Sequence, residues 1–105
     1  MKKLKKPKVL EATVKRAVRK ELKRIGAYQH WPVQFGLGEA CLDCHACYCG
    51  HYFAIETKRP GGKMTLRQKL TGKRILAAGG MVYMIDSIQT AKDVIKDMEV
   101  IFGDK

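Results

Sequence analysis

The sequence lacks a long hydrophobic run, and this absence excludes whole classes of protein. Its longest apolar stretches, such as residues 77–85, fall far short of the ~20 residues that a membrane-spanning helix needs. No apolar segment of the secretory type follows the basic N-terminus, so we expect a cytoplasmic protein. Hydrophobic residues still make up 46% of the 105 residues, which excludes a wholly disordered chain.

Acidic residues are also scarce, at 10 against 21 Lys and Arg, and the basic excess is concentrated at one end. Residues 1–24 hold 11 basic and two acidic residues, whereas residues 25–105 hold 10 and eight. A basic arm on a nearly neutral body is typical of proteins that bind polyanions, because Lys and Arg displace counterions from phosphates. The pattern favours nucleic acid as the partner; a membrane surface and a merely solvated helix are the alternatives.

Hydrophobic periodicity and turn residues predict an α/β fold with the order α-β-β-β-α-β-α. A strand–helix–strand unit after a hairpin implies a small mixed β-sheet flanked by helices. Residues 1–7 are expected to form a flexible basic tail, and residues 8–105 a single domain. The predicted helices span residues 8–25, 65–78 and 90–101, and the predicted strands span residues 27–31, 42–48, 51–57 and 81–85.

Local signals fix several of these boundaries. Cys49 and Gly50 lie between two strand-like segments at the length of a hairpin turn. Thr65 and Gln68 have the spacing of a capping box, which predicts the start of the second helix. A similar pattern at Thr90 predicts the start of the last helix.

Three charged residues in the predicted hairpin have the spacing of a catalytic site. Asp43 starts one strand and Glu56 ends its antiparallel partner, so the two carboxylates are expected to converge. Lys58 lies two residues beyond Glu56 and projects to the same face. Paired carboxylates suit Mg²⁺ or Mn²⁺ and hydrolysis of a phosphodiester, with the Thr57 carbonyl as a further ligand. The alternative is an exposed ion pair between Glu56 and Lys58.

With this hairpin, the sequence resembles the VRR-NUC (virus-type replication-repair nuclease) family of the PD-(D/E)XK superfamily, in its stand-alone viral form. The resemblance rests on residues 42–68 and 76–87, which contain the acidic residue, the E-x-K, the RPGGK turn, the helix glutamine and the AGG segment in the family's order. It extends over nearly the whole chain. One departure is Leu42, where family members often have proline.

The resemblance implies a restriction-endonuclease-like core and a role for each matching residue. Asp43 and Glu56 become metal ligands, Thr57 the carbonyl ligand and Lys58 the catalytic lysine. Gln68 matches the family's glutamine near the active site, although a capping role alone would also explain it. Glu11 matches an upstream glutamate that contacts a metal, although an acid in a first helical turn is common.

Basic residues on the first helix and around the site are candidates for DNA contacts. The alternative interpretation is that these residues form only a solvated surface. They are Lys15, Arg16 and Arg19 on the helix, and Arg59, Lys63 and Arg67 near the carboxylates.

Four cysteines between residues 41 and 49, with His45 and His51 close by, form a rival candidate site. Such clusters can bind zinc, but zinc modules usually separate their cysteine pairs by 12 or more residues. A strand would also direct Cys44 and Cys47 to opposite faces. Nearby Tyr28, His30 and Trp31 could stack on bases, although we expect them to pack in the core.

The leading hypothesis is a metal-dependent DNA endonuclease in viral DNA replication, recombination or repair. The resemblance implies a structure-specific enzyme, including cutters of four-way (Holliday) junctions, that acts as a homodimer, and the host cytoplasm if the protein is viral. The first alternative is a non-catalytic, zinc-stabilised nucleic-acid-binding module. The second is a protein-interaction factor whose basic arm binds acidic partners.

Overall fold

The fold is described from a computed structural model of the chain, over residues 9–33 and 38–103. The order of elements is α-β-β-β-α-β-α, as the sequence predicts. The predicted tail, residues 1–7, lies outside the described residues. Within the described ranges, no helix is long and apolar enough to cross a membrane. The helices are α1 (Glu11–Arg24), α2 (Leu66–Ala77) and α3 (Ile88–Phe102), and the strands are β1 (Tyr28–His30), β2 (Cys44–Tyr48), β3 (His51–Thr57) and β4 (Met81–Ile85).

The four strands form one mixed sheet in the order β1-β2-β3-β4. Strand β2 is antiparallel to both β1 and β3, and β4 lies parallel to β3. In the β2–β3 turn, Cys49 and Gly50 both have positive φ, at 49° and 80°. Two successive left-handed residues form the hairpin turn that matches the twist of the strands, so the predicted hairpin is confirmed.

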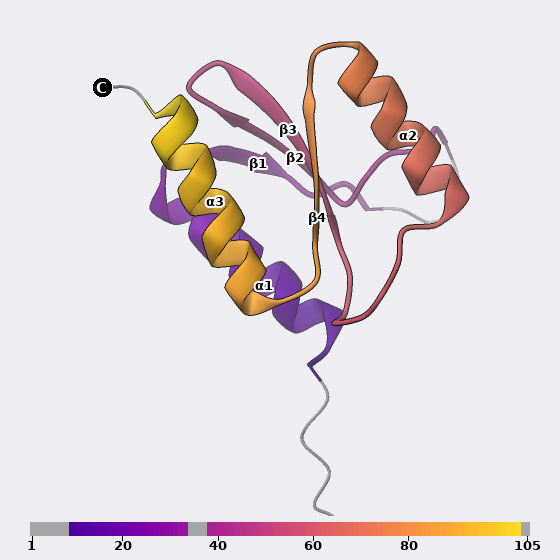
Figure 1. Ribbon diagram of the computed structural model, residues 1–105, viewed down its shortest axis with the longest axis horizontal. Helices are drawn as coiled ribbons and strands as arrows, with labels where there is room; N and C mark the ends of the chain where they lie inside the picture. The colour runs from indigo at the N-terminus through magenta and orange to yellow at the C-terminus, as the bar shows by residue number, and fades with distance from the viewer. Residues whose placement is uncertain (1–8, 34–37, 104–105) are drawn as a thin grey trace, which may run out of the picture.

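Helices α1 and α3 cover one face of the sheet, here called the α1–α3 face (Figure 1). Residues three or four apart on each helix turn toward the strands and are fully buried there. Phe53 and Ile55 of β3 meet them from the sheet. The core on this face is entirely apolar; its buried residues are Val14, Val18, Leu22, Cys44, Ala46, Phe53, Ile55, Ile85, Ala91, Ile95 and Met98.

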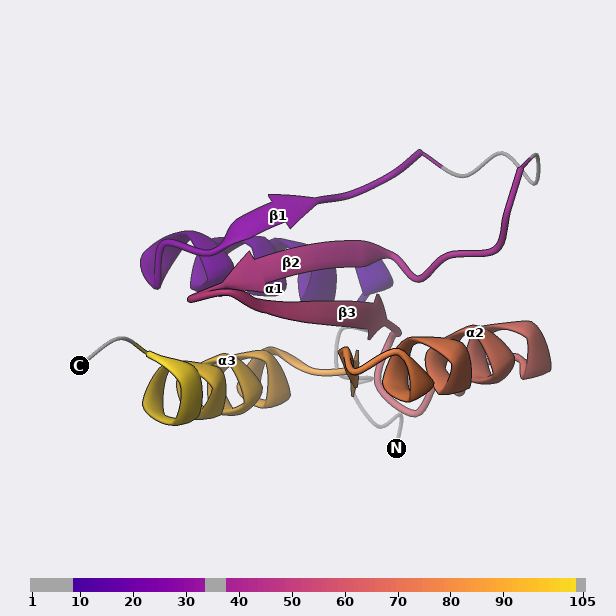
Figure 2. The ribbon, with the colours of Figure 1, turned by 90° about the horizontal axis from the view of Figure 1, so that it is seen from above.

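Helix α2 lies on the opposite face, here called the α2 face, and covers it only in part. Figure 2 shows α2 beside β4, whereas β1 and β2 lie beyond it. The helix buries only Thr71 and Gly72. A Cβ at Gly72 would lie 3.4 Å from the Val82 side chain, so this glycine lets α2 approach β4 closely. The α2 face of β1 and β2 is therefore left open.

The starts of two helices differ from the prediction: α1 begins at Glu11 and not at residue 8, because Leu10 is extended, and α3 begins before Thr90. Helix α2 begins with the predicted capping box, in which Thr65 and Gln68 exchange hydrogen bonds. Helix α3 begins two residues before the predicted Thr90, because the Ser87 hydroxyl accepts the hydrogen bond from the Thr90 N–H and caps the helix. Serine is as good an N-cap as threonine, so the earlier residue takes this role and the prediction was wrong.

Candidate active site

The hairpin brings Asp43 and Glu56 to the same end of the sheet. Asp43 directly precedes β2 and was predicted to lie inside it. Because Cys44 pairs with Ile55, the next position of the register sets Asp43 opposite Glu56. The Asp43 backbone N–H donates to Glu56 Oε1 at 3.2 Å. The two acidic residues are thus neighbours across the open end of the hairpin.

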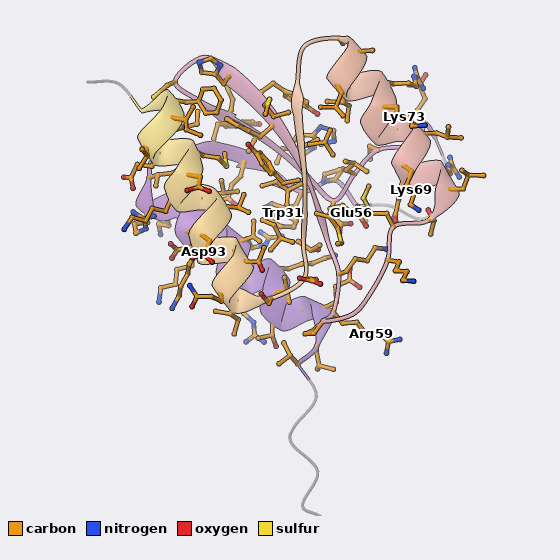
Figure 3. All side chains as sticks on the ribbon, in the orientation of Figure 1. Trp31, Glu56, Arg59, Lys69, Lys73 and Asp93 are labelled. Carbon is orange, nitrogen blue, oxygen red and sulfur yellow. The ribbon has the colours of Figure 1, made fainter. Side chains whose placement is uncertain are left out.

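Glu56 is a buried carboxylate surrounded by donors. Its side chain is only 2% exposed, and it lies near the centre of the molecule (Figure 3). Lys58 Nζ lies 3.3 Å from Glu56 Oε2, and Gln68 Nε2 donates to the same oxygen at 2.7 Å. Burial, and then the charge of Asp43, raise the pKa of Glu56 above its ordinary value, against the attraction of Lys58. The alternative prediction of an exposed ion pair between Glu56 and Lys58 is therefore wrong, because Glu56 is buried.

Asp43 is held by contacts that the sequence did not indicate. The Thr57 N–H and hydroxyl both donate to Asp43 Oδ2, at 3.0 and 2.8 Å. Lys15 Nζ on α1 lies 4.0 Å from Asp43 Oδ1. Thr57 has no exposed surface, although a threonine at a strand end gives no sign of this role in sequence. Lys15, predicted only as a DNA contact, lies beside a candidate metal ligand.

Glu11 lies apart from this group. It is exposed at the start of α1 and lines a shallow hollow together with Arg59 in the loop after β3. Glu11 and Lys15 are four residues apart, so they share a face of the helix. Among the described residues, no three His, Cys, Asp or Glu side chains gather closely enough to hold a metal ion. The structure therefore joins Asp43 and Glu56 as a pair and leaves Glu11 outside it.

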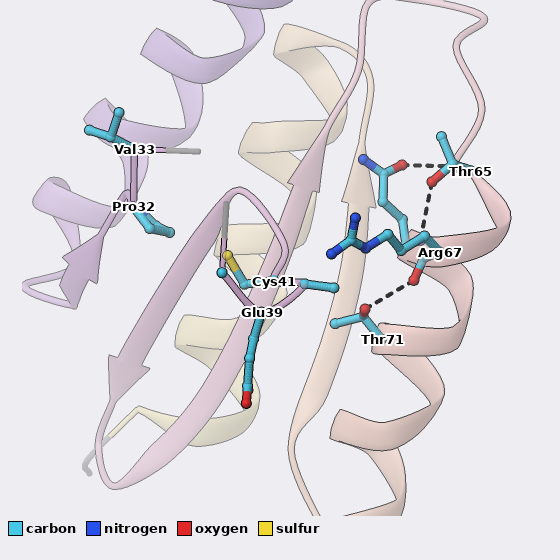
Figure 4. Close-up of a pocket in the computed structure, with 10 residues that line it drawn as sticks. Pro32, Val33, Glu39, Cys41, Thr65, Arg67 and Thr71 are labelled. Carbon is cyan, nitrogen blue, oxygen red and sulfur yellow. Dashed lines mark hydrogen bonds between the residues drawn. The ribbon is translucent and has the colours of Figure 1, made fainter. Parts of the chain in front are cut away.

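Gln68 links the carboxylates to a cavity beside α2. Its carbonyl accepts from the Thr65 N–H at 2.9 Å while its amide holds Glu56, so the capping and site positions coincide. The cavity measures about 320 Å³, and Arg67 extends across it from α2 toward the segment that carries Cys41 (Figure 4). The other basic candidates, Arg16, Arg19, Arg59 and Lys63, are all exposed.

The cysteines do not form a compact cluster. Cys44 is buried in the core, whereas Cys47 and Cys49 are exposed. The Cys44 side chain has no exposed surface, and burial raises the pKa of its thiol to about 12. The predicted separation of Cys44 and Cys47 onto opposite faces is confirmed. Nothing in this arrangement favours a zinc module.

The three aromatic candidates separate into two groups. Trp31 packs against the core. The Arg19 guanidinium lies over the Trp31 ring, and its carbon is 4.6 Å from the centroid of that ring. Tyr28 is 67% exposed, and His30 is also exposed. Core packing was therefore the wrong expectation for Tyr28 and His30, because alternation along β1 turns both side chains to the open face of the sheet.

Comparisons with known proteins establish the fold. No protein-family model and no curated protein matches the chain. A solved structure described as "VRR_NUC domain" matches with a TM-score of 0.71 and 17% sequence identity, over 82% of this chain and 94% of that chain. The protein thus has the fold of a VRR-NUC domain, a small α/β nuclease fold, as the resemblance in sequence implied.

Proposed function

We propose that the protein is a divalent-metal-dependent DNA endonuclease of the VRR-NUC family. The observation that carries this proposal is the convergence of Lys58 and Gln68 on Glu56, a buried carboxylate next to Asp43. Burying a carboxylate beside a second one is costly, and folded proteins retain such pairs chiefly at functional sites. The fold shared with a VRR-NUC domain supports the same conclusion.

The donor set at this site fits Mg²⁺ or Mn²⁺. Asp43 and Glu56 supply the carboxylate oxygens that these hard cations prefer. Burial, and then the charge of Asp43, raise the pKa of Glu56, and a bound cation would favour its ionised form against both. When bound, it would polarise a phosphodiester and lower the pKa of a water molecule. We propose the Thr57 carbonyl as a further ligand, and Glu11, which lies apart from the pair, as a ligand that contacts the cation through water.

The chain's own groups would bind and orient the scissile phosphate. Lys58, whose side chain is 18% exposed, carries a positive charge on the side of Glu56 that the phosphate would approach, and it would stabilise charge that develops on phosphorus. Gln68 holds Glu56 in one orientation through its 2.7 Å hydrogen bond. Arg59, Lys63 and Arg67 are exposed around the site and would bind neighbouring phosphates.

We propose branched DNA, including four-way junctions, as the substrate and a homodimer as the active form. A four-way junction has two-fold symmetry, and one small domain with one site would need a second copy to make paired cuts. Large apolar side chains on the outer side of α2 offer a surface for such pairing: Leu66, Leu70 and Leu76 are 73%, 51% and 53% exposed. Viral DNA metabolism in the host cytoplasm is the proposed setting.

A cleavage assay with a panel of substrates tests this function. The substrates are labelled four-way junction, single-stranded and plain duplex DNA, each with Mg²⁺, Mn²⁺ or EDTA. We expect metal-dependent paired cuts in the junction that are lost in Glu56→Ala and Lys58→Ala. Cutting of all three substrates would keep the chemistry and reject junction specificity. Absence of cleavage under every condition would reject the nuclease.

A further inference from the structure

Four ring-bearing side chains lie in a row on the open part of the α2 face. We call Tyr28, His30, His45 and Tyr52 the aromatic row. His30 and His45 are directly paired across β1 and β2, with ring centroids 6.4 Å apart. His45 and Tyr52 follow at 5.9 Å, and the Tyr52 hydroxyl contacts His45 Nδ1. The rings of His30, His45 and Tyr52 therefore follow one another across three strands, and Tyr28 is exposed two residues before His30 on the same side of β1.

The aromatic row faces outward although the sheet has a closed apolar face available. Tyr28 is 67% exposed and Tyr52 39%, and α2 does not extend over β1 and β2. The α1–α3 face instead contains Phe53, with the aromatic residues Trp31, Tyr48, Tyr83 and Phe102 packed against the same core. Neighbouring aromatic side chains on an exposed sheet are the arrangement with which proteins stack unpaired bases.

Two adjoining cavities, together called the hollow, lead from the aromatic row to Gln68. A cavity of about 290 Å³ lies between His45 and Tyr52 on the sheet and Arg74 on α2. Thr71 and Cys41 line both this cavity and the cavity of about 320 Å³ that Gln68 lines. Gln68 in turn donates to Glu56. A strand that lies along this hollow would reach from the aromatic row to the candidate catalytic site.

The charges along the hollow suit a nucleic-acid strand. Arg67 and Arg74 are seven residues apart, so both lie on the side of α2 that lines the hollow, and Glu39 is the one acid among the lining residues described. The hollow therefore offers cations on its helix side and the rings of His45 and Tyr52 on its sheet side.

We infer that the aromatic row stacks on unpaired bases next to the scissile phosphate, so that the preferred substrate is DNA with a single-stranded segment adjoining the cut. Bases inside a duplex stack on one another, and only unpaired bases offer a free ring face to a protein. The inference rests on the proposed nuclease function and sharpens its substrate. It favours flaps, gaps and branches that expose unpaired bases, including a four-way junction that opens at its crossover, over continuous duplex.

The first test measures DNA binding in EDTA, where cleavage cannot interfere. The probes are a fluorescently labelled 15-residue oligo(dT) and a labelled, fully paired hairpin, and binding is followed by anisotropy. The Tyr28→Ala, His30→Ala double variant removes the two exposed rings of β1. We expect its affinity for oligo(dT) to fall about tenfold or more, the loss typical of one base–aromatic stack, with hairpin affinity within twofold of wild type.

Two controls make the binding result specific. Tyr28→Phe keeps the ring and is expected to bind as wild type does. Val100→Ala removes an apolar side chain of similar exposure, 60%, from α3 on the other face and is expected to change neither affinity. Equal losses on both probes, or no loss on oligo(dT), would overturn the inference.

Cleavage assays separate this inference from the proposed function. With metal present, we expect a duplex that carries a single-stranded flap to be cut at least tenfold faster than a blunt duplex, and the double variant to lose most of that preference. If the wild type cuts neither DNA but the double variant loses affinity for oligo(dT), the proposed nuclease function is rejected and base stacking by the aromatic row is retained. If the wild type cuts and the double variant keeps the same preference for the flap, base stacking is rejected and the nuclease function is retained.

Discussion

The two faces of the sheet are built from opposite kinds of residue. On the α1–α3 face, two helices enclose an apolar core whose buried members include no Asp, Glu, Lys, Arg or His. On the α2 face, one helix buries only Thr71 and Gly72 and leaves a hollow beside the carboxylate of Glu56. The α1–α3 face stabilises the fold, so the α2 face can hold charged groups whose burial lowers stability.

The largest expected effect comes from breaking the core on the α1–α3 face. Phe53 is fully buried and packs against Tyr83 and Phe102. Phe53→Ala is expected to lower the free energy of unfolding by about 3–5 kcal/mol, because it removes buried apolar surface and leaves a cavity. Urea denaturation measures this loss. A loss below ~1 kcal/mol would mean that this face does not carry the stability.

Lys58→Ala is expected to cause a large loss of activity and a loss of stability smaller than that of Phe53→Ala, because the buried Glu56 loses its cation. Cleavage should slow by about 10²–10³-fold, because the positive charge beside the phosphate is lost. Single-turnover cleavage and thermal melting measure the two effects. Lys69→Ala is the control, since Lys69 is an exposed lysine of α2 (Figure 3). Equal rates for the two variants would contradict the role of Lys58.

Thr57→Val tests the contact that holds Asp43. The change removes the hydroxyl that donates to Asp43 Oδ2 at 2.8 Å and keeps the backbone N–H bond at 3.0 Å. Cleavage is expected to fall by about tenfold, the scale of one hydrogen bond to a charged group. Thr57→Ser should restore the rate. An unchanged rate in Thr57→Val would show that the hydroxyl does not position Asp43.

The smallest expected effect is a pH dependence of stability in EDTA. The pKa of Glu56 is raised in the folded protein, so its stabilising contribution is greatest below the unfolded value and declines as pH rises through the folded value. Glu56→Gln does not titrate at this position. The melting temperature of the wild type minus that of Glu56→Gln should therefore decrease from pH 4.5 to pH 7.5. A difference that increases over this range would mean that folding lowers the pKa of Glu56 and does not raise it.

Much of the fold could be predicted because its signals are local. The apolar spacing of Val14, Val18 and Leu22 predicted α1, and the turn residues Cys49 and Gly50 predicted the hairpin. The start of α3 could not be predicted, since Ser87 and Thr90 are both good caps and only the path of the chain from β4 selects Ser87.

The candidate site was predictable only where strand register determines it. The pairing of Asp43 with Glu56 follows from the hairpin, and the position of Lys58 follows from alternation along β3. The contacts of Thr57 and Lys15 with Asp43 depend on how helix and strand ends meet in space, which no local pattern encodes. The exposure of Tyr28 depends likewise on α2 leaving β1 uncovered.

Manganese-dependent cleavage by the wild type and by Glu56→Gln tests the central claim most directly. Glu56 is buried at a cost to stability, and we attribute its retention to metal-dependent hydrolysis. The account predicts saturable, Mn²⁺-dependent cleavage of branched DNA by the wild type, and none by Glu56→Gln at an unchanged or higher melting temperature. Cleavage that persists in EDTA, or a folded Glu56→Gln variant that cuts at the wild-type rate, would contradict it.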